Sequence, residues 1–68
     1  MLEKRSFALS GHRTSVALEP EFWAVLAEIA GREGVALSAL VTRLDAARAE
    51  GQPLASALRV FALRGARG

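Results

Sequence analysis

The sequence contains no cysteine and only one histidine, His12, among its 68 residues. The lack of cysteine excludes disulfide bonds, and a single histidine cannot complete a closed zinc site within one chain. A core of this size contributes only about 3–5 kcal/mol, so small chains usually depend on disulfides, metals or oligomerisation. Since 51% of the residues are hydrophobic, we expect an oligomer that needs no cofactor.

The sequence also lacks long apolar runs and catalytic motifs. No run approaches the roughly 18 apolar residues of a transmembrane helix. Met1–Ser10 has no apolar stretch of the kind found in signal peptides. We therefore expect a cytoplasmic protein with no membrane partner. No spacing resembles a nucleophile elbow, a metal motif or a P-loop, which indicates that the protein is not an enzyme.

The net charge of +2 is unevenly distributed along the chain. Residues 1–18 carry three basic side chains against one acidic side chain, whereas residues 19–50 carry six acidic side chains against three arginines. A basic N-terminal segment on a mildly acidic body favours a polyanion, such as a nucleic acid, as the partner. Ordinary surface charge is the alternative interpretation.

The segment His12–Leu18 has the alternation of a β-strand. Its two faces carry Thr14, Val16 and Leu18 on one side and Arg13, Ser15 and Ala17 on the other. Pro20 ends the strand and starts a helix. Because residues 20–64 are predicted to be helices and turns, this strand has no evident partner, and we expect it to pair with its copy in a homodimer.

The first 11 residues allow two interpretations. Ser10 and Gly11 indicate a turn, and Lys4–Leu9 alternates weakly, so the segment is either a flexible arm or an outer strand that folds back on His12–Leu18. We expect a partly ordered basic arm. We expect no internal repeat, low-complexity tract or linker anywhere in the chain.

Three helices are predicted after the strand. The first runs from about Pro20 to Arg32 and ends at a left-handed Gly34, and the second runs from Ser38, as N-cap, to about Glu50. The third, residues 53–64, is apolar over more than half of its circumference and is expected to be buried on more than one side. The side chains expected in the core or at a dimer contact are Val16, Leu18, Phe22, Trp23, Leu26, Ile29, Leu40, Leu44, Leu58 and Phe61.

The segments Thr14–Leu18, Phe22–Ala30 and Gly34–Val41, in this order and spacing, resemble the ribbon-helix-helix family of DNA-binding proteins. The resemblance covers residues 12–50. Further segments resemble a bacterial subgroup of short proteins with an extra C-terminal helix: Arg5–Ser6, Gly11–Ser15, Glu21–Trp23 and Ser56–Phe61. The expected organisation is therefore a basic arm at 1–11, a ribbon-helix-helix core at 12–50, and a C-terminal helix with a frayed tail at 51–68.

The resemblance implies a mainly α-helical fold, in which one short strand pairs with its copy in an intertwined homodimer and three helices follow. It also implies a small transcriptional regulator whose two-stranded ribbon enters the major groove of double-stranded DNA. The outward strand residues Arg13, Ser15 and Ala17 would read bases, although the family usually has polar residues at all three positions. The helix end with Ser38 and Ala39 would bind a phosphate. Lys4 and Arg5 would contact phosphates from the arm.

Each of these roles has a simpler alternative. Arg13 could be solvated or paired with Glu19, Ser15 could be a neutral surface residue, and Lys4 and Arg5 could belong to a disordered tail. A second functional hypothesis is a dimerisation or adaptor module, antitoxin-like, that binds a protein partner through the C-terminal helix. Ala17, the modest net charge and the apolar C-terminal helix favour this second hypothesis.

Overall fold

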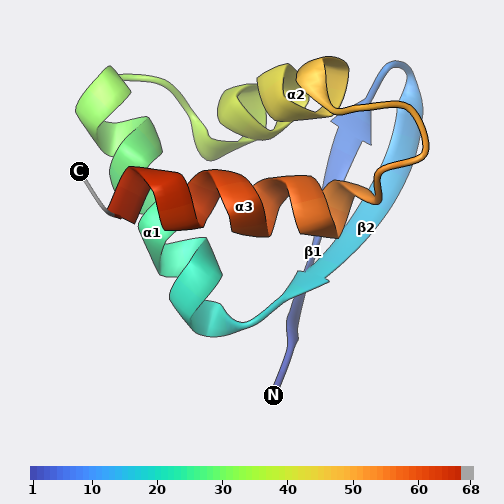
Figure 1. The fold of residues 1–68 in the computed structure, drawn as a ribbon. Helices are drawn as coiled ribbons and strands as arrows, with labels where there is room; N and C mark the ends of the chain where they lie inside the picture. Colours follow the sequence, from blue (N-terminus) through green and yellow to red (C-terminus); the bar gives the residue numbers. More distant parts are fainter. Residues whose placement is uncertain (67–68) are drawn as a thin grey trace.

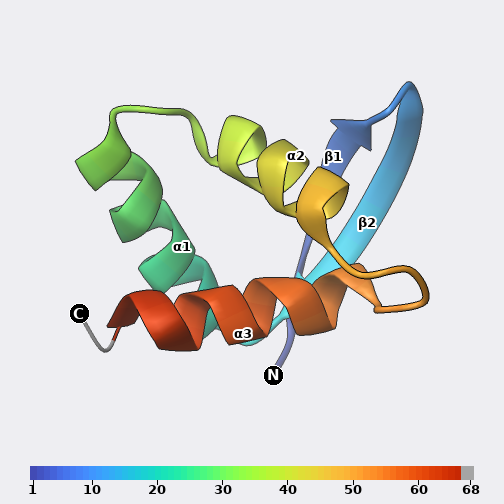
Figure 2. The ribbon, with the colours of Figure 1, turned by 45° about the horizontal axis from the view of Figure 1, so that its top comes forward.

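The computed structural model describes residues 1–66, which form a β-hairpin and three helices. The elements are β1 (Glu3–Leu9), β2 (His12–Leu18), α1 (Pro20–Glu33), α2 (Leu37–Ala47) and α3 (Leu54–Ala66). Figures 1 and 2 show the hairpin on one side of the molecule, with the three helices gathered against one of its faces. Part of the expected frayed tail, residues 67–68, lies outside the described residues.

The hairpin corrects the prediction for the N-terminal segment. β1 pairs antiparallel with β2, from Glu3 opposite Leu18 to Leu9 opposite His12. Ser10 (φ 51°) and Gly11 (φ 79°) form the connection, and two successive left-handed residues are typical of the tight turns that join antiparallel strands. The expected arm and the expected unpaired strand are therefore wrong over residues 3–18. Pairing of β2 with β1 requires closure of only a two-residue loop, whereas pairing with a second copy of β2 requires association of two chains.

One face of the hairpin supplies part of a single core. Leu9, Val16 and Leu18 are buried there against side chains of all three helices. Trp23 of α1 is 1% exposed, and its indole Nε1 donates a hydrogen bond to the Glu3 carbonyl oxygen at 2.8 Å. Since a buried indole N–H needs an acceptor, this bond fixes α1 against β1.

The buried side chains agree with the faces expected from the sequence. The fully buried members of the expected core set are Val16, Leu18, Trp23, Leu26, Ile29, Leu40 and Leu58. The half-buried members, which pack against that core, are Phe22, Leu44 and Phe61. α1 starts at Pro20 and stops before Gly34, whose φ of 72° is left-handed, so both predicted ends agree with the structure to within one residue.

α2 begins one residue earlier than predicted and ends three residues earlier. Its N-cap is Ala36, without a side-chain cap, so Ser38 lies inside the first turn and the predicted Ser38 cap is wrong. Leu37 is half-buried against the core. Packing of this apolar side chain places Leu37 in the helix and moves the cap position back to Ala36.

α3 is covered on more than one side by the rest of the chain. It contacts α1, α2 and β2, and Leu58 and Ala62 are buried, whereas Val60 and Leu63 are exposed. A Cβ atom on Gly65 would overlap the Ile29 side chain, so the C-terminal end of α3 lies very close to α1. The expected burial of α3 on more than one side therefore occurs within a single chain, and Val60 and Leu63 lie on its exposed strip.

Gly34→Ala is expected to destabilise the protein by about 1–2 kcal/mol, because an L-residue is strained at a left-handed position. The matched control is Gly31→Ala, three residues earlier in α1, where a Cβ meets nothing within 4 Å. It should stabilise by roughly 0.5–1 kcal/mol. Urea unfolding measures both, and equal effects of the two variants would contradict the left-handed cap.

Leu40→Ala is expected to cost about 2–5 kcal/mol, since Leu40 is 0% exposed and its loss leaves a cavity. Leu2→Ala is the control, because Leu2 is 52% exposed just before β1, and its effect should stay within about 0.5 kcal/mol. Thermal or urea unfolding compares them. A loss below roughly 1 kcal/mol for Leu40→Ala would mean that α2 does not bury Leu40 in the core.

Candidate nucleic-acid interface

The candidate site is the hairpin face that points away from the helices, here called the outer face. Its six side chains are Lys4, Ser6 and Ala8 from β1 and Arg13, Ser15 and Ala17 from β2. All are exposed except Ala17, which is half-buried. Because side chains alternate across a strand, burial of Leu9, Val16 and Leu18 on the inner face turns these six residues outward.

Only small side chains lie on the outer face between its two long cationic residues, Lys4 and Arg13. At its centre the hydroxyls of Ser6 and Ser15 lie opposite each other, with the two Oγ atoms 3.1 Å apart. Ala8 lies opposite Arg13, and Ala17 lies opposite Lys4. The two cations therefore occupy diagonally opposite corners of the ribbon, separated along the strands by roughly 13 Å, since strands rise about 3.3 Å per residue.

The cations of the outer face are not neutralised by any of the residues that the structure describes. Among residues 1–66, Lys4, Arg13, Arg32 and Arg64 form no ion pair and no side-chain hydrogen bond. The other described arginines all pair with acids, in Arg5–Glu3, Arg43–Glu33, Arg48–Asp45 and Arg59–Glu19. The alternative that Arg13 pairs with Glu19 is therefore wrong in this structure.

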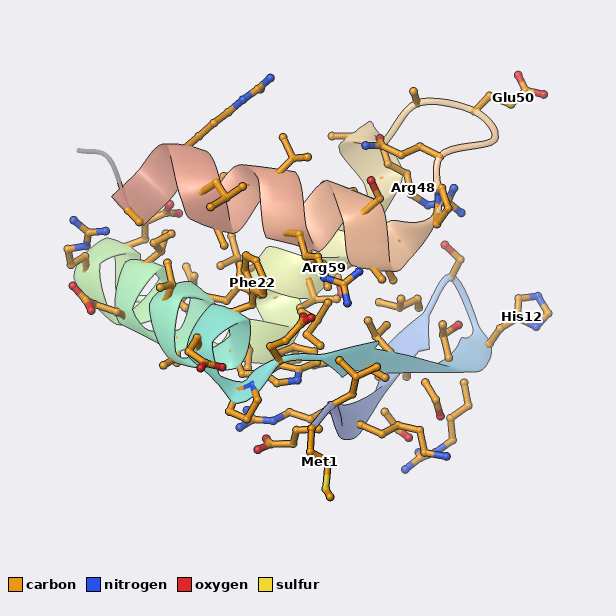
Figure 3. All side chains as sticks on the ribbon, turned by 60° about the horizontal axis from the view of Figure 1, so that its bottom comes forward. Met1, His12, Phe22, Arg48, Glu50 and Arg59 are labelled. Atoms are coloured by element: carbon orange, nitrogen blue, oxygen red, sulfur yellow. The ribbon has the colours of Figure 1, made fainter. Side chains whose placement is uncertain are left out.

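Glu19 is instead bound by Arg59 of α3. The Arg59 Nε donates to Glu19 Oε1 at 3.1 Å, and the guanidinium lies 5.9 Å from the centre of the Phe22 ring. Figure 3 labels Arg59 and Phe22 between α3 and α1. A hydrogen bond with its own backbone, followed by the Arg59 contact, lowers the pKa of the Glu19 carboxyl. Arg59 thus joins α3 to the β2–α1 connection.

Arg43 is held by Glu33 in the same manner. Its two terminal nitrogens donate to the two Glu33 oxygens at 2.8 and 3.2 Å, which joins α2 to the end of α1. The hydrogen bond from Arg43 lowers the pKa of the Glu33 carboxyl. Both side chains are engaged in a structural contact.

Arg5, predicted as a phosphate contact, lies on the inner face. Its guanidinium lies 5.0 Å from the centre of the Trp23 ring, and its Nε donates to Glu3 Oε2 at 2.7 Å. Lys4, the neighbouring residue, points to the outer face. The structure therefore separates two residues that the sequence analysis treated alike.

Ser38 and Ala39 are exposed in the first turn of α2. Figures 1 and 2 show this end of α2 directed away from the hairpin. Ser38 accepts a hydrogen bond from the Thr42 hydroxyl through its backbone carbonyl at 2.8 Å. Within one chain, the predicted phosphate site of α2 is therefore not brought together with Arg13, Ser15 and Ala17. His12 lies exposed at the hairpin turn, visible at the end of the ribbon in Figure 3.

Sequence reasoning missed Ser6 and Ala8. The signal that identifies them is the weak alternation of Lys4–Leu9, which allows an outer strand as well as the flexible arm that we expected. Once β1 is a strand, every second residue from Lys4 onward must share the face of Arg13 and Ser15.

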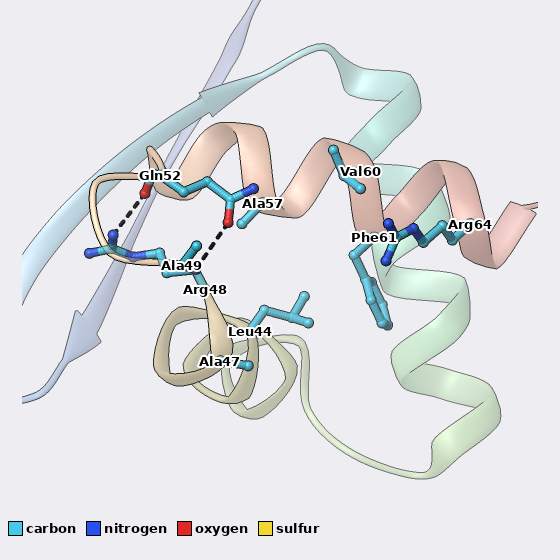
Figure 4. A pocket seen from close by; sticks show the side chains of 9 residues that line it. All are labelled: Leu44, Ala47, Arg48, Ala49, Gln52, Ala57, Val60, Phe61 and Arg64. Carbon is cyan, nitrogen blue, oxygen red and sulfur yellow. Dashed lines mark hydrogen bonds between the residues drawn. The ribbon is translucent and has the colours of Figure 1, made fainter.

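A second concave region lies between α2 and α3. This groove of about 370 Å³ has an apolar floor that includes Leu44, Val60 and Phe61, with Arg48 and Arg64 at its edge. Arg48 donates to the Gln52 backbone carbonyl at 2.7 Å, and the Gln52 side-chain oxygen accepts from the Ala49 backbone N–H. Figure 4 marks both bonds with dashed lines. These bonds close the α2–α3 loop at one end of the groove.

No cluster of metal-ligating side chains occurs in the described part of the chain. Within the same residues, no helix has the length and apolar character needed to cross a membrane.

The comparisons with known proteins agree with this architecture. A family model described as a ribbon-helix-helix domain matches residues 2–66. The chain therefore belongs to the ribbon-helix-helix family, a class of non-enzymatic DNA-binding domains that generally dimerise. No curated protein and no solved structure matches the sequence. The match includes β1 and α3 as well as the expected core of residues 12–50.

Arg5→Ala is expected to lower the free energy of unfolding by about 0.5–1 kcal/mol, through loss of the contact with Trp23. Lys4→Ala removes the same charge from the opposite face and should change it by less than about 0.5 kcal/mol. Urea unfolding followed by Trp23 fluorescence measures both variants. A larger loss for Lys4→Ala would contradict the assignment of the two faces.

Proposed function

We propose that the outer face of the hairpin binds double-stranded DNA by entering the major groove, and that the protein is a small transcriptional regulator. The observation that carries this proposal is the combination of two unpaired cations, Lys4 and Arg13, with exposed hydroxyls and small side chains on a face without acidic residues. Membership of a DNA-binding family supports the same function.

The dimensions and chemistry of the ribbon are compatible with this groove. The major groove is about 12 Å wide and admits a two-stranded β-ribbon. The Arg13 guanidinium can donate two hydrogen bonds to the O6 and N7 atoms of guanine, and the Ala17 methyl group can contact a thymine methyl. Ser6 and Ser15 supply hydroxyls that can donate or accept. Lys4 provides the second cationic contact.

A homodimer is a second part of this proposal and is tested separately. The unpaired strand that first suggested it is absent, because β1 pairs with one edge of β2 within the chain. The other edge of β2 has no strand partner among residues 1–66. General dimerisation of the family still supports it, and so do the exposed Val60 and Leu63 of α3. Ser38 and Ala39 would contact phosphates beside the ribbon only if a second copy brought its α2 there. Sedimentation equilibrium tests the dimer.

Lys4→Ala and Arg13→Ala are each expected to weaken binding to duplex DNA, by about 1–3 kcal/mol for the arginine if it makes a bidentate base contact. Affinity should fall as salt rises, because bound phosphates release counterions, and each lost phosphate contact should reduce the log–log slope by about 0.9. Mobility shifts at several salt concentrations measure both quantities.

The matched control is Arg32→Ala, which removes an equally unpaired cation on α1, away from the hairpin. It should leave DNA binding unchanged. Weakening of the same size by Arg32→Ala would indicate attraction by overall charge rather than recognition by the outer face. Unchanged binding by Arg13→Ala would exclude the ribbon as the reading element.

A second candidate function is docking of a protein partner on α3. The apolar groove between α2 and α3, whose lining includes the exposed Val60, and the exposed Leu63 on the same helix favour this function. Failure of the wild-type protein to shift any duplex at low salt would make this the better account.

A further inference from the structure

The two strands of the hairpin are copies of one short motif. Lys4–Leu9 reads Lys-Arg-Ser-Phe-Ala-Leu, and nine residues further on Arg13–Leu18 reads Arg-Thr-Ser-Val-Ala-Leu. Serine, alanine and leucine recur at the same positions, and each copy begins with a basic residue. The expectation of no internal repeat is therefore wrong. The copies are short and differ at three of six positions, two of them inward, which hides them in the sequence.

The strand register converts this repeat into a two-fold symmetric surface. Ser6 pairs with Ser15, and a two-fold rotation through the midpoint of this pair exchanges the antiparallel strands. The rotation superposes Lys4 on Arg13 and Ala8 on Ala17, because each pair of equivalent residues differs by the same nine positions. The observed register places this axis at the centre of the two copies, whereas a shift of one residue would put equivalent residues on opposite faces of the ribbon.

The symmetry is better preserved on the outer face than on the inner face. On the inner face, Arg5 corresponds to Thr14 and Phe7 to Val16, as expected for side chains that meet three different helices. On the outer face, the equivalent residues are two serines, two alanines and two basic residues, Lys4 and Arg13. Exposed positions are under little packing constraint, so their equivalence points to a ligand that is itself two-fold symmetric.

Double-stranded DNA has this symmetry wherever its sequence is an inverted repeat, and two-fold symmetric proteins match it with palindromic sites. We propose that the hairpin of a single chain reads a short inverted repeat, with its local two-fold axis at the Ser6–Ser15 pair and with Lys4 and Arg13 as equivalent readers of the two halves. This inference rests on the proposed DNA binding and gives it a substrate class. A dimer would then carry two such ribbons.

The test begins with selection of bound sequences from a pool of random duplexes by the wild-type protein. The selected motif should contain an inverted repeat. Three duplexes are then compared: the symmetric site, a site with one half altered, and a site with both halves altered. Wild type should prefer the symmetric site to the half-altered site by about 5- to 150-fold, the factor expected for one base-reading contact.

The variants then separate one-chain reading from two-chain reading. Lys4→Ala and Arg13→Ala each leave one reader, which can face the intact half in either orientation. Each variant should therefore bind the symmetric and half-altered sites nearly equally and still prefer both to the fully altered site. Lys4→Arg is the matched control, since it keeps both readers and should retain the preference for the symmetric site.

Other outcomes overturn the inference. If two chains read one site through Arg13 alone, Arg13→Ala would bind all three duplexes equally and Lys4→Ala would behave as wild type. A selected motif without an inverted repeat would also overturn it, while the proposed DNA binding would stand. Failure to bind any duplex would refute the proposed function itself. Far-UV circular dichroism of each variant confirms that the exposed substitutions leave the fold intact.

Discussion

The backbone pairing of β1 with β2 decides where the rest of the molecule can go. The register turns Leu9, Val16 and Leu18 inward, and a shift of one residue would turn these side chains outward. The inner face then has three helices packed on it, with Trp23 joined to the Glu3 carbonyl. The outer face is left without apolar cover, and its small and cationic side chains remain accessible.

The distribution of ion pairs follows the same division. Arginines that lie over the helical body are held by nearby acids, as in Arg43 with Glu33 and Arg59 with Glu19. These contacts connect elements that are distant in the chain, although exposed pairs of this type contribute little to stability individually. Lys4 and Arg13 form no ion pair within residues 1–66, so their charge is available to a polyanion.

The helical part of the fold could be predicted from local patterns. The apolar spacing of α1, Pro20 at its start and Gly34 at its end specify that helix without reference to the rest of the chain. The start of α2 was predicted incorrectly because Ser38 has the chemistry of a cap, whereas packing of Leu37 against the core sets the boundary. Of the candidate site, Arg13, Ser15 and Ala17 were identified because alternation over His12–Leu18 is strong.

The sequence by itself determined the family, the three helices, the strand at His12–Leu18 and the outward position of Arg13. These features depend on the periodicity and end signals of contiguous residues. Only the tertiary structure decided that Lys4 and Arg5 lie on opposite faces and that β1 is the partner of β2. It also decided that Ser6 meets Ser15, which reveals the repeat as a symmetry. The physical reason is that strand pairing is a relation between two segments, and its register depends on which side chains the helices bury.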